Sequence, residues 1–213
     1  LDDLKKRITS VKSTQKITKA MKMVAAAKLK RAQDSAEKGR PYSEKMNKII
    51  LNLSENISDK ENAPKLLTGT GSEKVHLCII LTSDRGLCGG FNSNIIKRCI
   101  EIADSSEANV SFICIGKKGG DILSKRYNVI ETNNQIFDNL TFENIAIIAD
   151  SLMGKFLDKE FDSIDLVYNK FKNAATQIVT NEQFLPIEKH ESKDYQTNSL
   201  DYIFEPSKIK IIS

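Results

Sequence analysis

The chain has 213 residues, of which 40% are apolar and 28% are charged, and this composition is typical of a soluble protein that can build a core. It excludes disordered, collagen-like and disulfide-scaffold proteins. The formal net charge of +4 conceals an asymmetry, because residues 1–60 carry 15 basic against 7 acidic side chains while residues 61–213 carry 17 against 21. No stretch approaches 18 consecutive apolar residues and the first residues lack the apolar run of a secretory signal, so we expect neither membrane spanning nor export.

The first 58 residues are predicted to form one long helix. From Leu4 to Lys38 there is no Gly, Pro or aromatic residue, and alternate steps of four and three from Leu4 give a heptad seam that is mostly apolar outside its polar middle. The same register continues beyond Gly39 and Pro41 as far as Ile57, which favours a single helix with a bend at Pro41. Such a helix would be about 80 Å long.

The seam of this helix needs a partner, because an isolated helix cannot bury an apolar stripe by itself. A second apolar stripe, made by Ile17, Ala20, Met21 and Val24, flanks the polar middle of the seam. We therefore expect the helix to pack against another helix, another subunit or both, and to change partners partway along its length.

Residues beyond 74 are predicted to form an α/β domain with a mainly parallel sheet, because apolar strand-like runs alternate with helix-like stretches. Residues 59–74, rich in Gly, Thr and charge, are expected to be a linker. Asn92 or Ser93 is the predicted cap of the first helix in this domain, and Thr141 that of the last. The predicted strands are 75–82, 110–115, 128–132 and 163–171, with an extended segment at 175–186 beside the last, and the predicted helices are 94–103, a short one within 116–127, and 141–159.

The glycine-bearing loop SDRGLCGGFNS, residues 83–93, raises the hypothesis of nucleotide binding after the first strand. Its glycines do not make GxGxxG, however, and GKKGG at 116–120 is not a phosphate-binding GxxxxGK followed by Ser or Thr. A loop shaped for packing or for a partner is the interpretation we favour. Asp84 and Arg85 stand where α/β enzymes often place active groups, yet no histidine lies near in sequence and no GxSxG motif is present. We expect an exposed Asp-Arg pair that pins the loop.

The cysteines and histidines do not suggest a metal centre. Four cysteines without a CxxC motif and only two histidines offer no zinc site. Three of the cysteines, Cys78, Cys99 and Cys114, lie in apolar contexts and are expected to be buried thiols in a reducing compartment. We therefore predict no catalytic residue, no metal site and no cofactor.

The strongest electrostatic feature is a basic stretch with ten Lys or Arg between Lys5 and Arg31 and no acidic residue from Leu4 through Gln33. Such a stretch could bind nucleic acid or an acidic membrane surface. It has no aromatic residue for base stacking and only two arginines, which weakens base readout. Its basic residues are distributed around the helix, which favours a rod surrounded by acidic protein.

Four stretches of the chain resemble the gamma subunit of F-type ATP synthases, the central stalk of the rotary motor. They are QKITKAMKMVAAAK (15–28), RPY (40–42), LTSDRGLCGGFN (81–92) and DYIFEP (201–206). The resemblance implies an N-terminal helix paired with a C-terminal helix as a left-handed antiparallel coiled coil inside the ring of three alpha and three beta subunits. It also implies a Rossmann-like foot domain that touches the epsilon subunit and the membrane ring of c subunits.

The resemblance implies a division into four parts. They are a coiled-coil shaft helix at 1–58, a linker at 59–74, a Rossmann-like three-layer domain at 75–207, and the start of a C-terminal helix at 208–213. In the family that helix continues for many residues, whereas this sequence stops at Ser213. The resemblance further implies a peripheral place on the cytoplasmic side of a bacterial membrane, reached only through the complex, and an organellar complex is less expected.

The resemblance also assigns contact residues and a role without bond chemistry. The gamma subunit turns within a three-fold ring and biases each beta subunit among its conformations, and the nucleotide sites belong to other subunits. The residues expected to face the inner surface of the ring are Lys16, Lys19, Met21, Lys22, Met23 and Lys28, and those expected near the c ring are Tyr202, Phe204 and Glu205. The alternatives are a nucleic-acid-binding protein with a basic helical arm and a nucleotide-dependent enzyme, although we expect no nucleic-acid partner.

Overall fold

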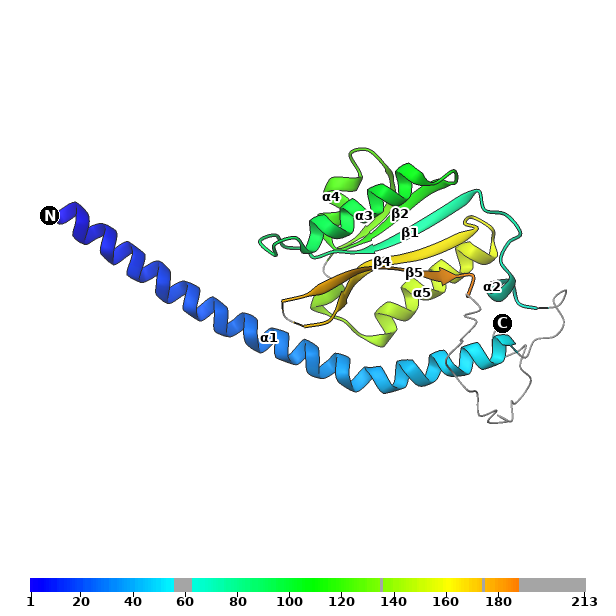
Figure 1. Cartoon of the computed structure of the whole chain (residues 1–213), viewed down its shortest axis with the longest axis horizontal. Helices are drawn as coiled ribbons and strands as arrows, with labels where there is room; N and C mark the ends of the chain where they lie inside the picture. Colours follow the sequence, from blue (N-terminus) through cyan, green and yellow to red (C-terminus); the bar gives the residue numbers. More distant parts are fainter. Residues whose placement is uncertain (56–62, 135, 174, 188–213) are drawn as a thin grey trace. The chain divides into compact units, whose positions relative to one another are not determined.

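A computed structural model describes residues 1–55, 63–134, 136–173 and 175–187, and the chain divides into two units, Leu1–Leu53 and Ser54–Ser213 (Figure 1). The first unit consists of helix α1, Asp2–Glu55, which runs without interruption through Pro41. The predicted long N-terminal helix is therefore confirmed. Leu, Lys, Ala, Met and Gln dominate its sequence, and these residues lose little side-chain freedom in a helix.

The second unit is built on a five-stranded sheet in the order β3-β2-β1-β4-β5. The first four strands in this order pair in parallel and β5 pairs antiparallel with β4, which confirms the predicted mainly parallel α/β fold. The strands are β1 Val75–Leu81, β2 Asn109–Ile115, β3 Asn128–Asn133, β4 Ser163–Phe171 and β5 Gln177–Leu185.

Helices cover both faces of this sheet and make three layers (Figure 1). The helices are α2 Lys65–Thr68, α3 Phe91–Ser105, α4 Lys117–Leu123 and α5 Phe142–Leu157, with a 3-10 turn η1 at Ile136–Asp138. Successive side chains of β1 point to opposite faces of the sheet and so enter two separate cores. Leu77 and Ile79 pack towards α5 on one face, while Cys78 and Ile80 pack towards α3 and α4 on the other.

The predicted buried cysteines lie in the core under α3. Cys78, Cys99 and Cys114 are buried free thiols, as predicted, and Cys88 is exposed. Burial raises the pKa of Cys78 and of Cys114 to about 12 and also raises the pKa of Cys99. All three therefore stay protonated at neutral pH and behave as small apolar side chains.

Two local predictions differ from the structure. The predicted linker contains α2, whose Leu66 and Leu67 are buried, with Leu66 in the core beside α5. Two adjacent leucines after Pro64 were the signal for this turn, because proline favours a helix start. The first helix of the domain begins at Phe91 and Gly90 precedes it without a side-chain cap, so the predicted Asn92 or Ser93 cap is wrong. Thr141 does cap α5, since its hydroxyl accepts a hydrogen bond from Asn144 N at 3.3 Å.

Candidate functional site: the surface of the long helix and the loop after the first strand

The apolar residues in the first half of α1 are exposed in the part of the chain that the structure describes, whereas Ile49, Ile50 and Leu51 near its end are half-buried. Leu4, Ile8 and Val11, the first members of the predicted seam, are 63%, 53% and 67% exposed. Met21 and Val24 of the second stripe are as open. Singly exposed apolar residues are ordinary, but a periodic row of them along a helix marks a surface that a partner covers.

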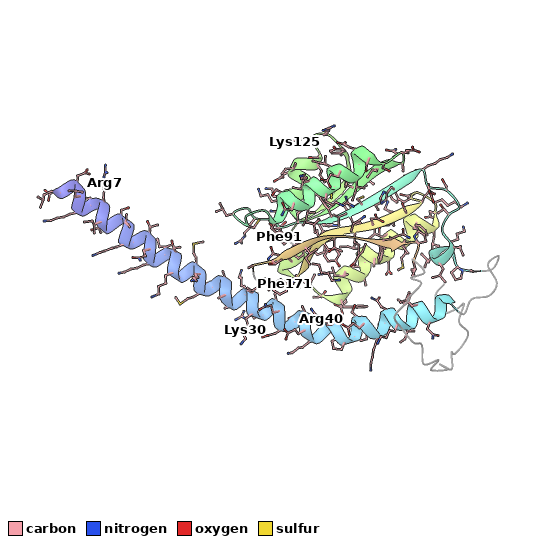
Figure 2. All side chains as sticks on the ribbon, in the orientation of Figure 1. Arg7, Lys30, Arg40, Phe91, Lys125 and Phe171 are labelled. Carbon is pink, nitrogen blue, oxygen red and sulfur yellow. The ribbon has the colours of Figure 1, made fainter. Side chains whose placement is uncertain are left out.

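The predicted contact residues on α1 fall on two sides of the helix. With about 100° between successive residues, Lys16, Lys19 and Lys22 lie on one side, and Met23 lies among them. Met21 and Lys28 lie on the opposite side, in line with the second apolar stripe. All six side chains are exposed, and Figure 2 shows side chains standing out around this helix, including the labelled Arg7, Lys30 and Arg40. Along residues 16–28 the helix therefore carries Lys16, Lys19 and Lys22 on one side and Met21 with the second apolar stripe on the other. The basic residues of α1 as a whole are distributed around it.

Threonines in the first half of α1 bond to their own helix. The hydroxyls of Thr9, Thr14 and Thr18 donate to the carbonyl oxygens of Lys5, Ser10 and Thr14 at 3.0, 3.0 and 2.8 Å. Each of these hydroxyls therefore uses its hydrogen in a bond within the helix. Of the polar middle of the seam, Gln15, Thr18 and Lys22, the Thr18 hydroxyl is thus already bonded within the helix.

The loop between β1 and α3 is held by the side chain of Asn92. Its Oδ1 accepts a hydrogen bond from Ser83 N at 3.0 Å, and its Nδ2 donates to Cys88 Sγ at 3.2 Å. This use of the amide explains why Asn92 does not cap the helix. At the tip of the loop, Leu87 has φ 60° and its side chain is fully exposed. The loop thus displays an apolar side chain on a fixed backbone.

Asp84 fastens this loop to the neighbouring helix. Its Oδ1 accepts a hydrogen bond from Lys117 N, the first residue of α4, at 2.8 Å. Asp84, which is half-buried, therefore pins the loop through a backbone N–H of α4, and the predicted pairing with Arg85 stays a prediction.

The glycines at 116 and 119 of GKKGG serve close packing. A Cβ added at Gly116 would lie 2.0 Å from Thr82 O, and one at Gly119 would lie 2.4 Å from Ile80 Cδ1. The buried Thr82 hydroxyl donates to Gly116 O at 3.1 Å and accepts from Gly119 N at 2.9 Å. Protein atoms therefore lie where these two Cβ atoms would be, and Lys117 N, Lys118 N and Gly119 N already donate to Asp84 Oδ1, Ser83 O and Thr82 Oγ1. These internal bonds disfavour a phosphate at this turn, and spacing in the sequence alone did not reveal them.

The remaining predicted residues, Tyr202, Phe204 and Glu205, lie outside the described residues. Across the described parts of the chain, no group of three or more His, Cys, Asp or Glu side chains could hold a metal ion. In the same parts, no helix combines the length and apolarity needed to cross a bilayer.

Comparisons with known proteins agree on one family. A family model described as ATP synthase matches residues 1–213. The ATP synthase gamma chain of Pelagibacter ubique is 53% identical over 225 residues, covering 100% of this chain and 75% of that protein. The gamma chain of Christiangramia forsetii is 49% identical, covering 100% of this chain and 73% of that protein. Among solved structures, the central stalk and c ring of Tetrahymena thermophila mitochondrial ATP synthase matches with a TM-score of 0.64 and 31% identity over 80% of this chain and 72% of that one.

These matches extend over α1 and the α/β unit together. The chain accordingly belongs to the gamma-chain family of F-type ATP synthases, and it is a non-catalytic subunit of the central stalk.

Proposed function

We propose that α1 is the part of the rotor that turns inside the catalytic ring and contacts the alpha and beta subunits. The observation that carries this proposal is a 54-residue helix with an uncovered apolar stripe and a basic surface without acidic residues from Leu4 through Gln33. A cationic surface of this kind is complementary to acidic partner loops. Lys16, Lys19, Lys22 and Met23 form the proposed basic contact side, and Met21 and Lys28 lie on the apolar side.

The difference between the two sides of α1 gives the rotor its action. As the helix turns, each beta subunit of a three-fold ring faces the basic side, then the flanks, then the apolar side. A ligand shifts a conformational equilibrium only by its differential affinity for the states, and the same holds for a rotating surface. The unequal sides of α1 therefore favour a different conformation in each beta subunit at any angle.

The α/β unit is proposed to form the foot of the rotor outside the ring. Its partners are the epsilon subunit and the c ring, and Tyr202, Phe204 and Glu205 in the DYIFEP stretch are proposed to meet the polar loops of the c ring. We divide the chain into a shaft helix at 1–58, a connector at 59–74, a foot at 75–207 and the start of a returning helix at 208–213. The chain spans 75% and 73% of the length of the two gamma chains compared above.

The location follows from membership in a membrane-associated complex. We propose a peripheral position on the cytoplasmic side of a bacterial membrane, where the foot would meet the c ring and the helix would point into the catalytic ring. The bacterial sources of the most similar gamma chains compared above support this position.

Reconstitution tests the proposal. The full-length gene product, mixed with separately purified alpha and beta subunits, is expected to turn an almost inactive mixture into an active ATPase. A chain in which Lys16, Lys19 and Lys22 are replaced by Glu is expected to lose about tenfold or more of this stimulation, because three attractive contacts become repulsive. No stimulation by the unmodified chain would overturn the proposal.

A matched control makes the same three Lys-to-Glu changes on the α/β unit, which is the proposed foot. Replacing the exposed Lys97, Lys125 and Lys172 by Glu is expected to leave the stimulation unchanged. Equal losses in both triple variants would mean that net charge, and not the basic side of α1, drives assembly. Tight binding of the chain to duplex DNA at about 0.2 M salt would favour a nucleic-acid arm instead.

A further inference from the structure

The outer side of α5 combines acidic and apolar side chains that are exposed. Glu143, Ile147 and Asp150 follow one another at one-turn spacing, on the side of the helix that faces away from its buried residues, and they form an acidic row. Ile147 is 68% exposed, Phe142 at the start of the helix is 83% exposed, and both carboxylates are exposed. Residues 128–154 contain four acidic and no basic side chains, so no cation from this segment neutralises the row. The outer side of α5 therefore suits a partner that is both apolar and cationic.

The first turns of α1 show the opposite charge pattern. Lys5, Ile8 and Lys12 also follow one another at one-turn spacing and form a cationic row, in which an apolar side chain again lies between two charges. Leu4 and Val11 lie next to this row on the helix surface, and all five side chains are exposed. This end of α1 therefore suits a partner that is both apolar and anionic.

The two rows match residue by residue when the helices run antiparallel. The steps along the cationic row are three and then four residues, and the steps along the acidic row, counted back from Asp150, are also three and then four. The antiparallel arrangement thus brings three pairs together: Lys5 with Asp150, Ile8 with Ile147, and Lys12 with Glu143. A parallel arrangement matches the charges but moves Ile8 one residue away from Ile147. Within the described residues, none of the four charged side chains belongs to a salt bridge, so each is available to a partner.

We propose that Leu4–Lys12 of α1 binds the outer side of α5 in a second copy of this chain, as an antiparallel helix pair. A second copy is the partner that the charges and spacings indicate, because this chain itself carries both rows. The contact has only about two and a half turns, but a two-fold dimer contains it twice, since each copy supplies one row of each kind. Val11 then lies on the flank of α5 that carries Phe142 and adds apolar contact to the pair of isoleucines. The dimer is a state of the unassembled chain, and it does not depend on the proposed rotor function.

Sedimentation of the 213-residue chain over a concentration series tests the contact. We expect a monomer–dimer equilibrium that weakens several-fold between about 0.05 and 0.5 M salt, because salt screens the attraction between the two rows. A chain that stays monomeric at every concentration would overturn the proposal. A dimer that salt strengthens would also overturn it, since apolar contact alone would then hold the copies together.

Charge reversal identifies the pairs. Lys5→Glu with Lys12→Glu, and separately Glu143→Lys with Asp150→Lys, are each expected to weaken dimerisation at least about tenfold, because every pair of opposite charges becomes a pair of like charges. All four positions are exposed, so both double variants are expected to fold. A mixture of the two double variants is expected to dimerise as the unmodified chain does, because each reversed row then meets the other reversed row. Failure of the mixture to dimerise would contradict the pairing.

A control variant makes the same change in net charge elsewhere on α1. Lys38→Glu with Lys45→Glu lies about 40 Å or more beyond Lys12 along the helix, at exposed positions, and is expected to leave dimerisation unchanged. Equal weakening by this variant would show that the net charge of the chain, and not the cationic row, controls association, and the proposal would then be wrong.

Discussion

At the residue scale, Gly116 shows how one position fixes the contact between two strands and a helix. Its φ of 100° is a conformation that side chains rarely adopt, and Thr82 O occupies the place of a Cβ. Thr82, which is buried, binds Gly116 O and Gly119 N and so ties the end of β1 to the start of α4. The loop that carries Asp84 and Leu87 follows directly, so its position depends on this contact.

We predict that Gly116→Ala strongly destabilises the α/β unit, by about 3 kcal/mol or more, because it adds both a clash and an unfavourable φ. Urea unfolding followed by circular dichroism measures the loss. Gly154→Ala serves as the control, since Gly154 lies inside α5 with no atom near the added Cβ, and it is expected to stabilise by about 0.5 to 1 kcal/mol. A Gly116→Ala variant as stable as the unmodified chain would contradict this account of the loop.

At the scale of the element, the residues of α1 favour a helix by themselves. Its first apolar residues, such as Leu4 and Ile8, are exposed in the described parts of the chain. Gly39 and Pro41 do not end it, although Pro41 lacks an N–H and therefore removes one hydrogen bond of the ladder. Most of the stability of a helix in a protein comes from packing of its apolar face. If α1 packs against other subunits as proposed, the helix should open locally at low cost in the free chain.

Limited proteolysis tests this view of α1. Trypsin is expected to cut the free chain first after the Lys and Arg residues of α1, because its turns open more easily than those of the packed unit. Mass spectrometry of the early fragments identifies the sites, with the exposed Lys97, Lys125 and Lys172 as internal comparators. In the assembled complex the same α1 sites are expected to resist cleavage. Early cuts at the three comparators with α1 intact would contradict the prediction.

At the scale of the whole molecule, the α/β unit is closed by contacts between segments far apart in the sequence. Asp162, just before β4, binds the Thr70 hydroxyl and accepts hydrogen bonds from Lys74 N at 3.0 Å and Val75 N at 3.1 Å. The hydrogen bond from Thr70, helped by those from the two backbone N–H groups, holds the pKa of Asp162 below its ordinary value. One carboxylate thus joins the entry of β1 to the entry of β4.

We predict that this carboxylate makes the stability of the unit depend on pH. Because its pKa is lowered on folding, the charged form stabilises the fold above the ordinary aspartate range, and this contribution disappears as the pH falls through the lowered pKa. Asp162→Asn should therefore cost about 1 kcal/mol at pH 7, and the difference from the unmodified chain should shrink towards pH 3. Thermal unfolding at both pH values measures it, and a difference that is independent of pH would contradict the role of the charge.

The extent of sequence-based prediction differed between the parts of the chain, for physical reasons. Periodicity and propensity are local, so the long helix, the strands from β1 to β4 and the Thr141 cap were predicted within a few residues. The short α2 was missed because four residues carry no period, and its role depends on Leu66 reaching the core beside α5. The candidate site residues on α1 came from the resemblance, helix geometry places them on two sides of the helix, and their contacts stay predictions.

The sequence by itself determined a long helix with a basic stretch, free of acids from Leu4 through Gln33, that needs a partner, and an α/β unit with buried thiols. Charge, period and apolar context are properties of neighbouring residues, and the sequence therefore shows them directly. Only the tertiary structure decided that Asn92 holds a loop and does not cap a helix, that the glycines at 116 and 119 meet Thr82 and Ile80, and that β5 runs antiparallel at an open edge. Those outcomes depend on contacts between residues that are far apart in the sequence and meet only in the folded unit. No short stretch of the sequence contains both partners of such a contact.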